Sequence, residues 1–268
     1  MRPLSASVRG IGLLGPGLDD WLSGASVLAG ITPYTARATV LPTPVALPAA
    51  ERRRTGIVVK LALAIGFEAA ARAGVNPAEL PTVFSSSGGD GINCHEICQT
   101  LATGDRQLSP TRFHNSVHNA ASGYWSIAAG ATPASSVLCA FDATFSAALL
   151  EALTQVAVDQ TSVLLVAYDS GYPEPLHSVR PIPDAFGVAM VLTPVSGPPT
   201  PAAAIISAAL TDAPAESMRD ARLEALRAEI PAARGLPLLA KLARRESGRV
   251  VIDYLEAQRI AIEVSACG

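Results

Sequence analysis

Apolar residues recur along the chain with two different periods, and stretches of the two kinds alternate. Short, almost uninterrupted apolar runs, of which 162–168 is the strongest, are typical of strands buried in a central sheet. Apolar positions that recur every three or four residues, as between Val58 and Ala70, predict helices instead. The predicted strands are residues 8–14, 81–84, 135–140, 162–168, 188–192 and 203–210, and the predicted helices are residues 55–74, 91–103, 115–129 and 144–156. Their alternation predicts an α/β fold in which helices are layered on a sheet.

The end of the chain has a different character from the rest. Residues 216–229 are rich in charge, and Met218, Leu223 and Leu226 form an apolar stripe among them, which predicts an amphipathic helix. Residues 250–254 and 260–264 are typical of a closing pair of strands.

Composition and charge exclude several classes of function. A net charge of −3, a pI near 5.8 and the absence of a basic stripe argue against nucleic-acid binding. The longest apolar stretches have the length of a strand, well below the ~18–20 residues of a membrane-spanning helix. Ser5, Ser7 and Arg9 interrupt the N-terminal region, so it does not resemble a secretion signal. We therefore expect a cytoplasmic protein with no membrane span.

The four cysteines, Cys94, Cys98, Cys139 and Cys267, are expected to be reduced thiols in that compartment. Cys94, His95 and Cys98 lie close together in sequence, as zinc ligands often do. A second pair of ligands is missing, however, and on a helix His95 points away from the face that the two cysteines share. We predict neither a metal site nor a cofactor.

Three motifs follow one another in the middle of the chain. Residues 83–89 read VFSSSGG, residues 109–123 read SPTRFHNSVHNAASG, and residues 133–148 hold a predicted strand, a sharp turn and a helix. Further on, residues 180–181 are Arg-Pro and residues 186–192 form a returning strand. In this order and spacing, the motifs resemble the N-terminal half of a β-ketoacyl synthase. The resemblance covers about residues 80–195. It implies a thiolase-like layered α/β fold of which only the N-terminal half is present, a truncated β-ketoacyl synthase.

The resemblance also identifies the position of the family's catalytic cysteine. That cysteine lies at a sharp turn from strand to helix, where the N-terminus of the helix lowers the pKa of the thiol. Counted from Pro133, the corresponding residue is Phe141, which has no atom able to attack a thioester. Cys139 lies two residues earlier, within the predicted strand, and we interpret it as a buried structural thiol. No catalytic residue is predicted, with Cys139 as the alternative.

The second half of a ketosynthase resembles a duplicate of the first, and it supplies two histidines and a lysine for condensation. Residues 211–268 are too few for such a unit and contain no histidine. We therefore expect one ketosynthase-like domain over residues 1–268. Residues 1–210 would form the thiolase-like half-fold, and 211–268 a short tail of helix and strands that replaces the second half.

A half-fold without this chemistry resembles a chain-length factor, the inactive subunit that pairs with an active β-ketoacyl-ACP synthase and shapes its acyl tunnel. Short factors of this kind accompany the ketosynthases of aryl-polyene and related pigment pathways, in which an acyl carrier protein reaches the complex. The resemblance places Arg112, Phe113, His114, Val117 and His118 at the tunnel and partner interface. Bulky side chains there would stop the growing chain, and Arg112 would pair across the interface.

Several alternatives remain open at the level of sequence. Phe113 and Val117 can belong to the core of the chain itself, and the Tyr124–Trp125 pair can serve either the core or an interface. The chain can also be a homodimeric scaffold or a module that docks a carrier protein. A third possibility is an acyl-thioester enzyme that pairs Cys139 with His114 or His118.

Overall fold

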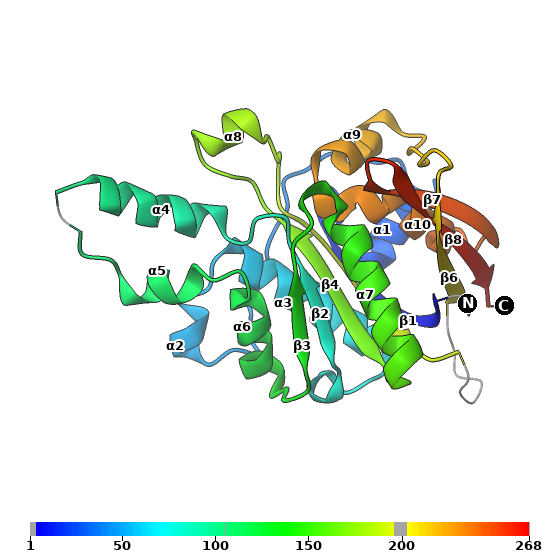
Figure 1. The fold of residues 1–268 in the computed structure, drawn as a ribbon, viewed down its shortest axis with the longest axis horizontal. Coiled ribbons are helices and arrows are strands. Elements are labelled where there is room, and N and C mark those ends of the chain that lie inside the picture. Colours follow the sequence, from blue (N-terminus) through cyan, green and yellow to red (C-terminus); the bar gives the residue numbers. More distant parts are fainter. Residues whose placement is uncertain (1–3, 105, 196–202, 268) are drawn as a thin grey trace.

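Eight strands hydrogen-bond in the order β3-β2-β4-β5-β1-β6-β8-β7 in the computed structural model, which describes residues 4–104, 106–195 and 203–267 (Figure 1). The strands are β1 (Leu4–Leu14), β2 (Thr82–Ser85), β3 (Ser135–Leu138), β4 (Val163–Asp169), β5 (Phe186–Thr193), β6 (Ala204–Thr211), β7 (Gly248–Leu255) and β8 (Gln258–Ala266). β2 runs parallel to both of its neighbours, β3 and β4, and the other neighbouring pairs are antiparallel. The mixed α/β ketosynthase-like fold is confirmed.

Helix α3 (Ile57–Ala73) covers one face of this sheet at short range. Gly10 and Gly12 of β1 face the helix, and a methyl group at either position would overlap its backbone carbonyls. Gly187 of β5 leaves room for the Ile65 and Leu61 side chains in the same way. Helix α6 (Ala120–Ala129) then packs on α3, with the ring of Trp125 seated over Gly66. Small residues thus set the distance between the layers.

Helix α7 (Thr144–Asp159) covers the opposite face (Figure 1). In β4, Leu165 and Ala167 contribute to the core beneath α7, whereas Leu164 and Val166 contribute to the core beneath α3. Residues 141–159, which include α7, have the length and apolar composition of a membrane span, but half of that stretch is buried. α7 is therefore a core helix of the domain.

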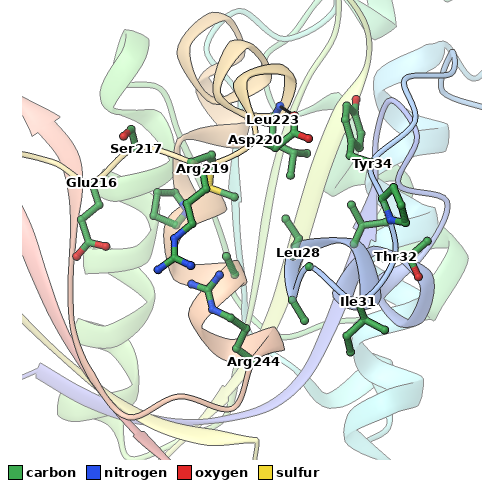
Figure 2. Close-up of a pocket in the computed structure, with 17 residues that line it drawn as sticks. Leu28, Ile31, Thr32, Tyr34, Glu216, Ser217, Arg219, Asp220, Leu223 and Arg244 are labelled. Carbon is green, nitrogen blue, oxygen red and sulfur yellow. Dashed lines mark hydrogen bonds between the residues drawn. The ribbon is translucent and has the colours of Figure 1, made fainter.

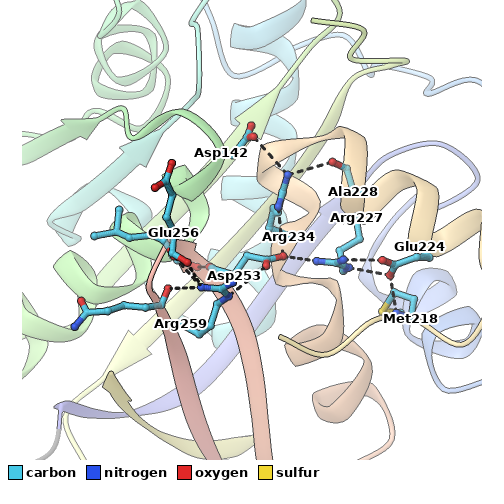
Figure 3. A network of polar contacts seen from close by, with 12 residues as sticks. Asp142, Met218, Glu224, Arg227, Ala228, Arg234, Asp253, Glu256 and Arg259 are labelled. Carbon is cyan, nitrogen blue, oxygen red and sulfur yellow. Dashed lines mark hydrogen bonds and ion pairs between the residues drawn. The ribbon is translucent and has the colours of Figure 1, made fainter. Parts of the chain in front are cut away.

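The tail continues the same sheet and the same core. β6 joins β8 and β7 to β1, and α9 (Ala221–Glu229), η3 (Pro231–Gly235) and α10 (Leu236–Ala243) pack on the α7 side, beside α1 (Trp21–Leu28). Figure 3 shows polar contacts that bind these elements together: Asp253 of β7 pairs with Arg227 of α9, Arg234 of η3 and Arg259 of β8. Arg234 also lies 3.6 Å from Asp142, which ties the tail to the turn before α7.

Two helices project away from the sheet as an arm (Figure 1). They are α4 (Gly91–Ala102) and α5 (Pro110–Asn115), which contact one another. The remaining short elements are α2 (Ala49–Arg52), α8 (Leu176–Val179), η1 (Pro77–Glu79) and η2 (Phe141–Ala143).

Several predicted boundaries are wrong; the strand expected over 8–14, for example, already begins at Leu4. The helix expected over 115–129 begins at Ala120, because the Asn115 side chain instead donates to the Arg54 carbonyl and accepts from the Tyr124 hydroxyl. The helix expected over 216–229 begins at Ala221, since Asp220 accepts from the amides of its first turn and acts as N-cap. The strand expected over 135–140 ends at Leu138. Helices α1 and α10 were not predicted.

Candidate functional site

The turn between β3 and α7 is the sharp elbow that the sequence predicts. Phe141 has φ of 51°, a left-handed conformation that a bulky side chain rarely adopts. The Thr144 hydroxyl holds this turn, since it donates to the Phe141 carbonyl over 2.6 Å and accepts from the Ala140 amide over 3.1 Å. The Phe141 side chain is 62% exposed. The elbow thus presents an exposed aromatic ring at its tip.

A guanidinium group covers one face of that ring. The Arg180 Cζ atom lies 3.9 Å from the centroid of Phe141, a distance typical of a cation–π contact. Arg180 also donates to Asp142 over 2.9 Å, so the carboxylate next to Phe141 fixes the arginine. Phe141 offers no group for acid–base or nucleophilic chemistry. The tip of the elbow is therefore filled by two bulky side chains, Phe141 and Arg180.

The carboxyl ends of the parallel strands β2, β3 and β4 bring further polar groups beside the elbow. The Cys139 thiol donates to the Ser87 carbonyl over 3.2 Å, and His118 Nε2 lies 2.9 Å from the Ser86 carbonyl. Cys139 is exposed, so the interpretation of a buried structural thiol is wrong. The reason is that β3 is the edge strand of the sheet and none of its residues is fully buried, and Cys139 lies just beyond its end.

Asp169, the last residue of β4, is fully buried at the same strand ends. Its carboxylate accepts hydrogen bonds from the Ser87 amide (2.8 Å), the Ser87 hydroxyl (2.7 Å), the Ser86 hydroxyl (3.3 Å) and the Ala232 amide of η3 (2.8 Å). Burial raises the pKa of Asp169 to about 6, against the opposing effect of these donors. This carboxylate joins the elbow region to the tail.

The predicted tunnel segment forms α5 and the turn after it, on the projecting arm. Phe113 is 66% exposed and Val117 is 53% exposed, so neither fills the core of the chain. The His114 ring stands edge-on to Tyr124, with 6.3 Å between the centroids. Arg112 forms an ion pair with Glu96 of α4, so the expected pairing across an interface is already met within the chain.

The Tyr124–Trp125 pair belongs to the core. Both residues belong to α6, and their side chains are almost fully buried. Trp125 packs against Phe67 of α3, with 4.7 Å between the ring centroids. An interface role for these two residues is excluded by their burial.

Comparison with known proteins agrees with this geometry. Residues 30–249 match the model of the β-ketoacyl synthase N-terminal domain. The chain belongs to this family. A comparison with curated protein sequences gave no match. Among solved structures, the chain is similar to a chain in the complex of ketosynthase ApeO with its chain length factor ApeC from Xenorhabdus doucetiae, with a TM-score of 0.73 and 23% identity.

Two further structures show the same fold in the ketosynthase family. The ishigamide ketosynthase/chain length factor gives a TM-score of 0.70 at 12% identity, and the AntDE:AntF complex, a type II polyketide ketosynthase with its acyl-carrier protein, gives 0.74 at 12%. The alignments cover 97% of this chain and 99% of the matched chain for the Xenorhabdus complex, 98% and 100% for ishigamide, and 100% of both for AntDE:AntF. Against a β-ketoacyl synthase from Burkholderia phymatum, only 71% of that chain is covered. The chain therefore matches chains of about its own length as well as a longer synthase.

Two residues of this ketosynthase-like site were not found from sequence. The sequence indicated Arg180, because the Arg-Pro turn was part of the resemblance, but it did not indicate that Arg180 contacts Phe141. For Asp169 the sequence indication is weaker: it is an acidic residue directly after the most apolar run of the chain. Within the described residues, no three His, Cys, Asp or Glu side chains are grouped to hold a metal ion.

Proposed function

We propose that this chain is a catalytically silent subunit of the chain-length-factor type. It pairs with an active β-ketoacyl-ACP synthase and shapes the acyl tunnel of that partner, in a fatty-acid or polyketide pathway of the aryl-polyene kind. The observation that carries the proposal is the elbow, whose strained backbone persists although Phe141 cannot attack a thioester and Arg180 covers its ring. An elbow that is built without a nucleophile supports a role in packing against a partner rather than in catalysis.

The proteins of similar length support this assignment. Two of the matched structures are named as complexes of a ketosynthase with a chain length factor. The matched chains align over almost their whole length, so a chain of this size has a counterpart in such complexes, which supports the proposed partnership.

The arm and the edge of the sheet provide a surface for the synthase. β3 is at the end of the strand order, so its outer side has no strand partner in the described part of the chain. Elsewhere on the arm and on α6, Leu101 of α4, Phe113 of α5, Val117 and Ile127 of α6 are also exposed. Exposed apolar side chains and an open strand edge are both features of protein interfaces.

Within this surface, Phe113 and Val117 are the residues we expect to meet the partner's acyl chain. They are apolar, bulky and free of contacts that would commit them to the core. His114 and His118 are held by Tyr124 and by the Ser86 carbonyl, so they position the segment. Arg112 stiffens the arm through Glu96.

Copurification of the chain with a ketosynthase from the same organism tests the partnership. The wild-type chain should form a one-to-one complex by mass in solution, with condensing activity only when both chains are present. Phe113→Lys should abolish the complex, because a charge would enter an apolar contact. Val158→Lys, at an equally exposed apolar position in the last turn of α7, is the matched control and should leave the complex intact.

The tunnel role requires a separate measurement on the intact complex. Phe113→Ala removes the ring that stops the chain, so the reconstituted complex should release longer acyl products, as seen by mass spectrometry. An unchanged product distribution in an intact complex would remove Phe113 from the tunnel while keeping the partnership.

A second candidate, an acyl-thioester enzyme, is favoured by one specific observation. Cys139 is exposed and, like His118, lies against the turn formed by Ser86 and Ser87. Loss of activity in Cys139→Ser, with the complex still formed, would support this candidate. A stable homodimer that ignores the ketosynthase would instead support a scaffold or a carrier-docking module.

A further inference from the structure

A pocket of about 380 Å³ lies between the tail and the loop after α1, away from the elbow (Figure 2). Its walls come from three segments: residues 27–34, residues 216–220 before α9, and α10. The volume is within the range of about 300–1,000 Å³ that is usual for small-molecule sites. None of the residues discussed above as tunnel or elbow residues lines it.

The floor of the pocket is apolar. Leu28 at the end of α1, Leu223 of α9 and Ala240 of α10 are buried and line it, and Met218 and Pro237 complete it. Tyr34 adds an aromatic wall, and its hydroxyl is already bound to the Pro16 carbonyl over 2.9 Å. This part of the pocket therefore suits an apolar group.

Two arginines line the same pocket from the tail. Figure 2 shows the guanidinium groups of Arg219 and Arg244 directed into one space at its edge. Arg219 has no hydrogen bond or ion pair with any residue that the structure describes. Arg244 uses Nε for Glu246, at 3.0 Å, which leaves its two terminal amino groups for another acceptor. Two guanidinium groups that share an opening create a position where a carboxylate is favoured.

Apart from Glu246, which binds only the Nε of Arg244, the acidic residues nearby make no ion pair with either arginine among the described residues. The Asp220 carboxylate accepts from the Arg222 and Leu223 amides and pairs with the Arg222 side chain. Glu216 also lines the pocket, but its side chain lies on the opposite side of Arg219 from Leu28 (Figure 2). Arg222 itself lies over the Tyr34 ring, at 5.3 Å, and is therefore committed elsewhere.

We propose that this pocket binds an organic carboxylate with an apolar chain. The carboxylate would lie between Arg219 and Arg244, and the apolar chain would lie along Leu28 and Leu223. An inorganic anion would leave the apolar floor hydrated, and an uncharged lipid would leave both guanidinium groups without a counter-charge.

The test is calorimetric titration of the full chain with sodium octanoate, sodium phosphate and octanol as separate probes. Octanoate should bind, and phosphate and octanol should each bind at least about tenfold more weakly, since each lacks one of the two interactions. In Arg219→Gln and Arg244→Gln, octanoate affinity should fall about fivefold, because exposed charge-assisted hydrogen bonds are screened by water. Arg53→Gln, an exposed arginine just after α2 that does not line the pocket, is the matched control and should bind octanoate as the wild type does.

Three results would overturn the proposal. They are no octanoate binding up to about 10 mM, equal affinity in the wild type and both pocket variants, and phosphate binding as tight as octanoate binding. A circular-dichroism melt of each variant must match that of the wild type, so that lost binding is not confused with lost folding. Where a glutamine variant melts early, Arg219→Lys, which keeps the charge, should retain most of the affinity.

Discussion

Replacement of Asp169 with asparagine tests how the buried carboxylate links the elbow to the tail. In the wild type, the folded chain holds this group at a pKa of about 6, above its ordinary value of 3.8, because desolvation outweighs its hydrogen bonds. Since the folded state binds the proton more tightly than the unfolded chain, stability is greatest when the carboxyl is protonated. It should therefore decrease as the pH rises between about 4 and 6.

The size of the effect follows from the pKa difference. The shift from 3.8 to about 6 corresponds to about 3 kcal/mol at neutral pH, of which about 2 kcal/mol is lost between pH 4.5 and pH 7. Asp169 is fully buried, so solvent screening does not reduce this figure. Asp169→Asn cannot ionise and should lack this pH dependence. The side-chain NH₂ group of the asparagine would face the Ala232 N–H, so two donors would oppose one another. This lowers the free energy of unfolding of the variant by about 1–3 kcal/mol, independently of pH.

The assay is urea unfolding of the chain at low micromolar concentration, followed by tryptophan fluorescence, at intervals from pH 4.5 to pH 7. We expect the stability difference between wild type and variant to change by about 2 kcal/mol across this range, with the variant closest to the wild type at pH 7. All other ionisable groups are the same in the two proteins, so the difference isolates Asp169. A difference that stays constant, or one that grows as the pH rises, would refute the reasoning.

Three further changes test other parts of the structure. Gly12→Ala should prevent soluble expression, because the added methyl group would overlap the Ile65 carbonyl. Gly123→Ala is the control: it has open space around it, so the variant should fold, and its free energy of unfolding in urea should rise by up to about 1 kcal/mol. Asp253→Asn should cost about 1–3 kcal/mol by the same assay, since it removes the negative charge that the tail arginines share, and an unchanged midpoint would contradict this. Phe141→Cys should not create condensing activity in the chain alone, and thioester condensation by the purified variant would disprove the silent-subunit proposal.

Most of the strands and two of the central helices could be predicted because their patterns are local. The buried run of β4 and the repeat of apolar residues in α3 each lie within one continuous stretch of sequence. Helix α10 escaped prediction since nearly all of its residues are buried and Pro237 lies in its first turn, so it shows no polar face. The break before α6 was missed because Asn115 bonds to Arg54, far away in sequence.

The sequence by itself determined the order of most elements and the ketosynthase resemblance, and it led to the prediction that Phe141 stands where the family has cysteine. These depend on residue identity and on spacing along the chain. Only the tertiary structure decided that Cys139 is exposed, that Arg180 covers Phe141, that Asp169 is buried beneath the tail, and that Arg219 and Arg244 share a pocket. Each of these depends on contacts between segments distant in sequence, and burial and charge pairing arise only when such segments are packed together.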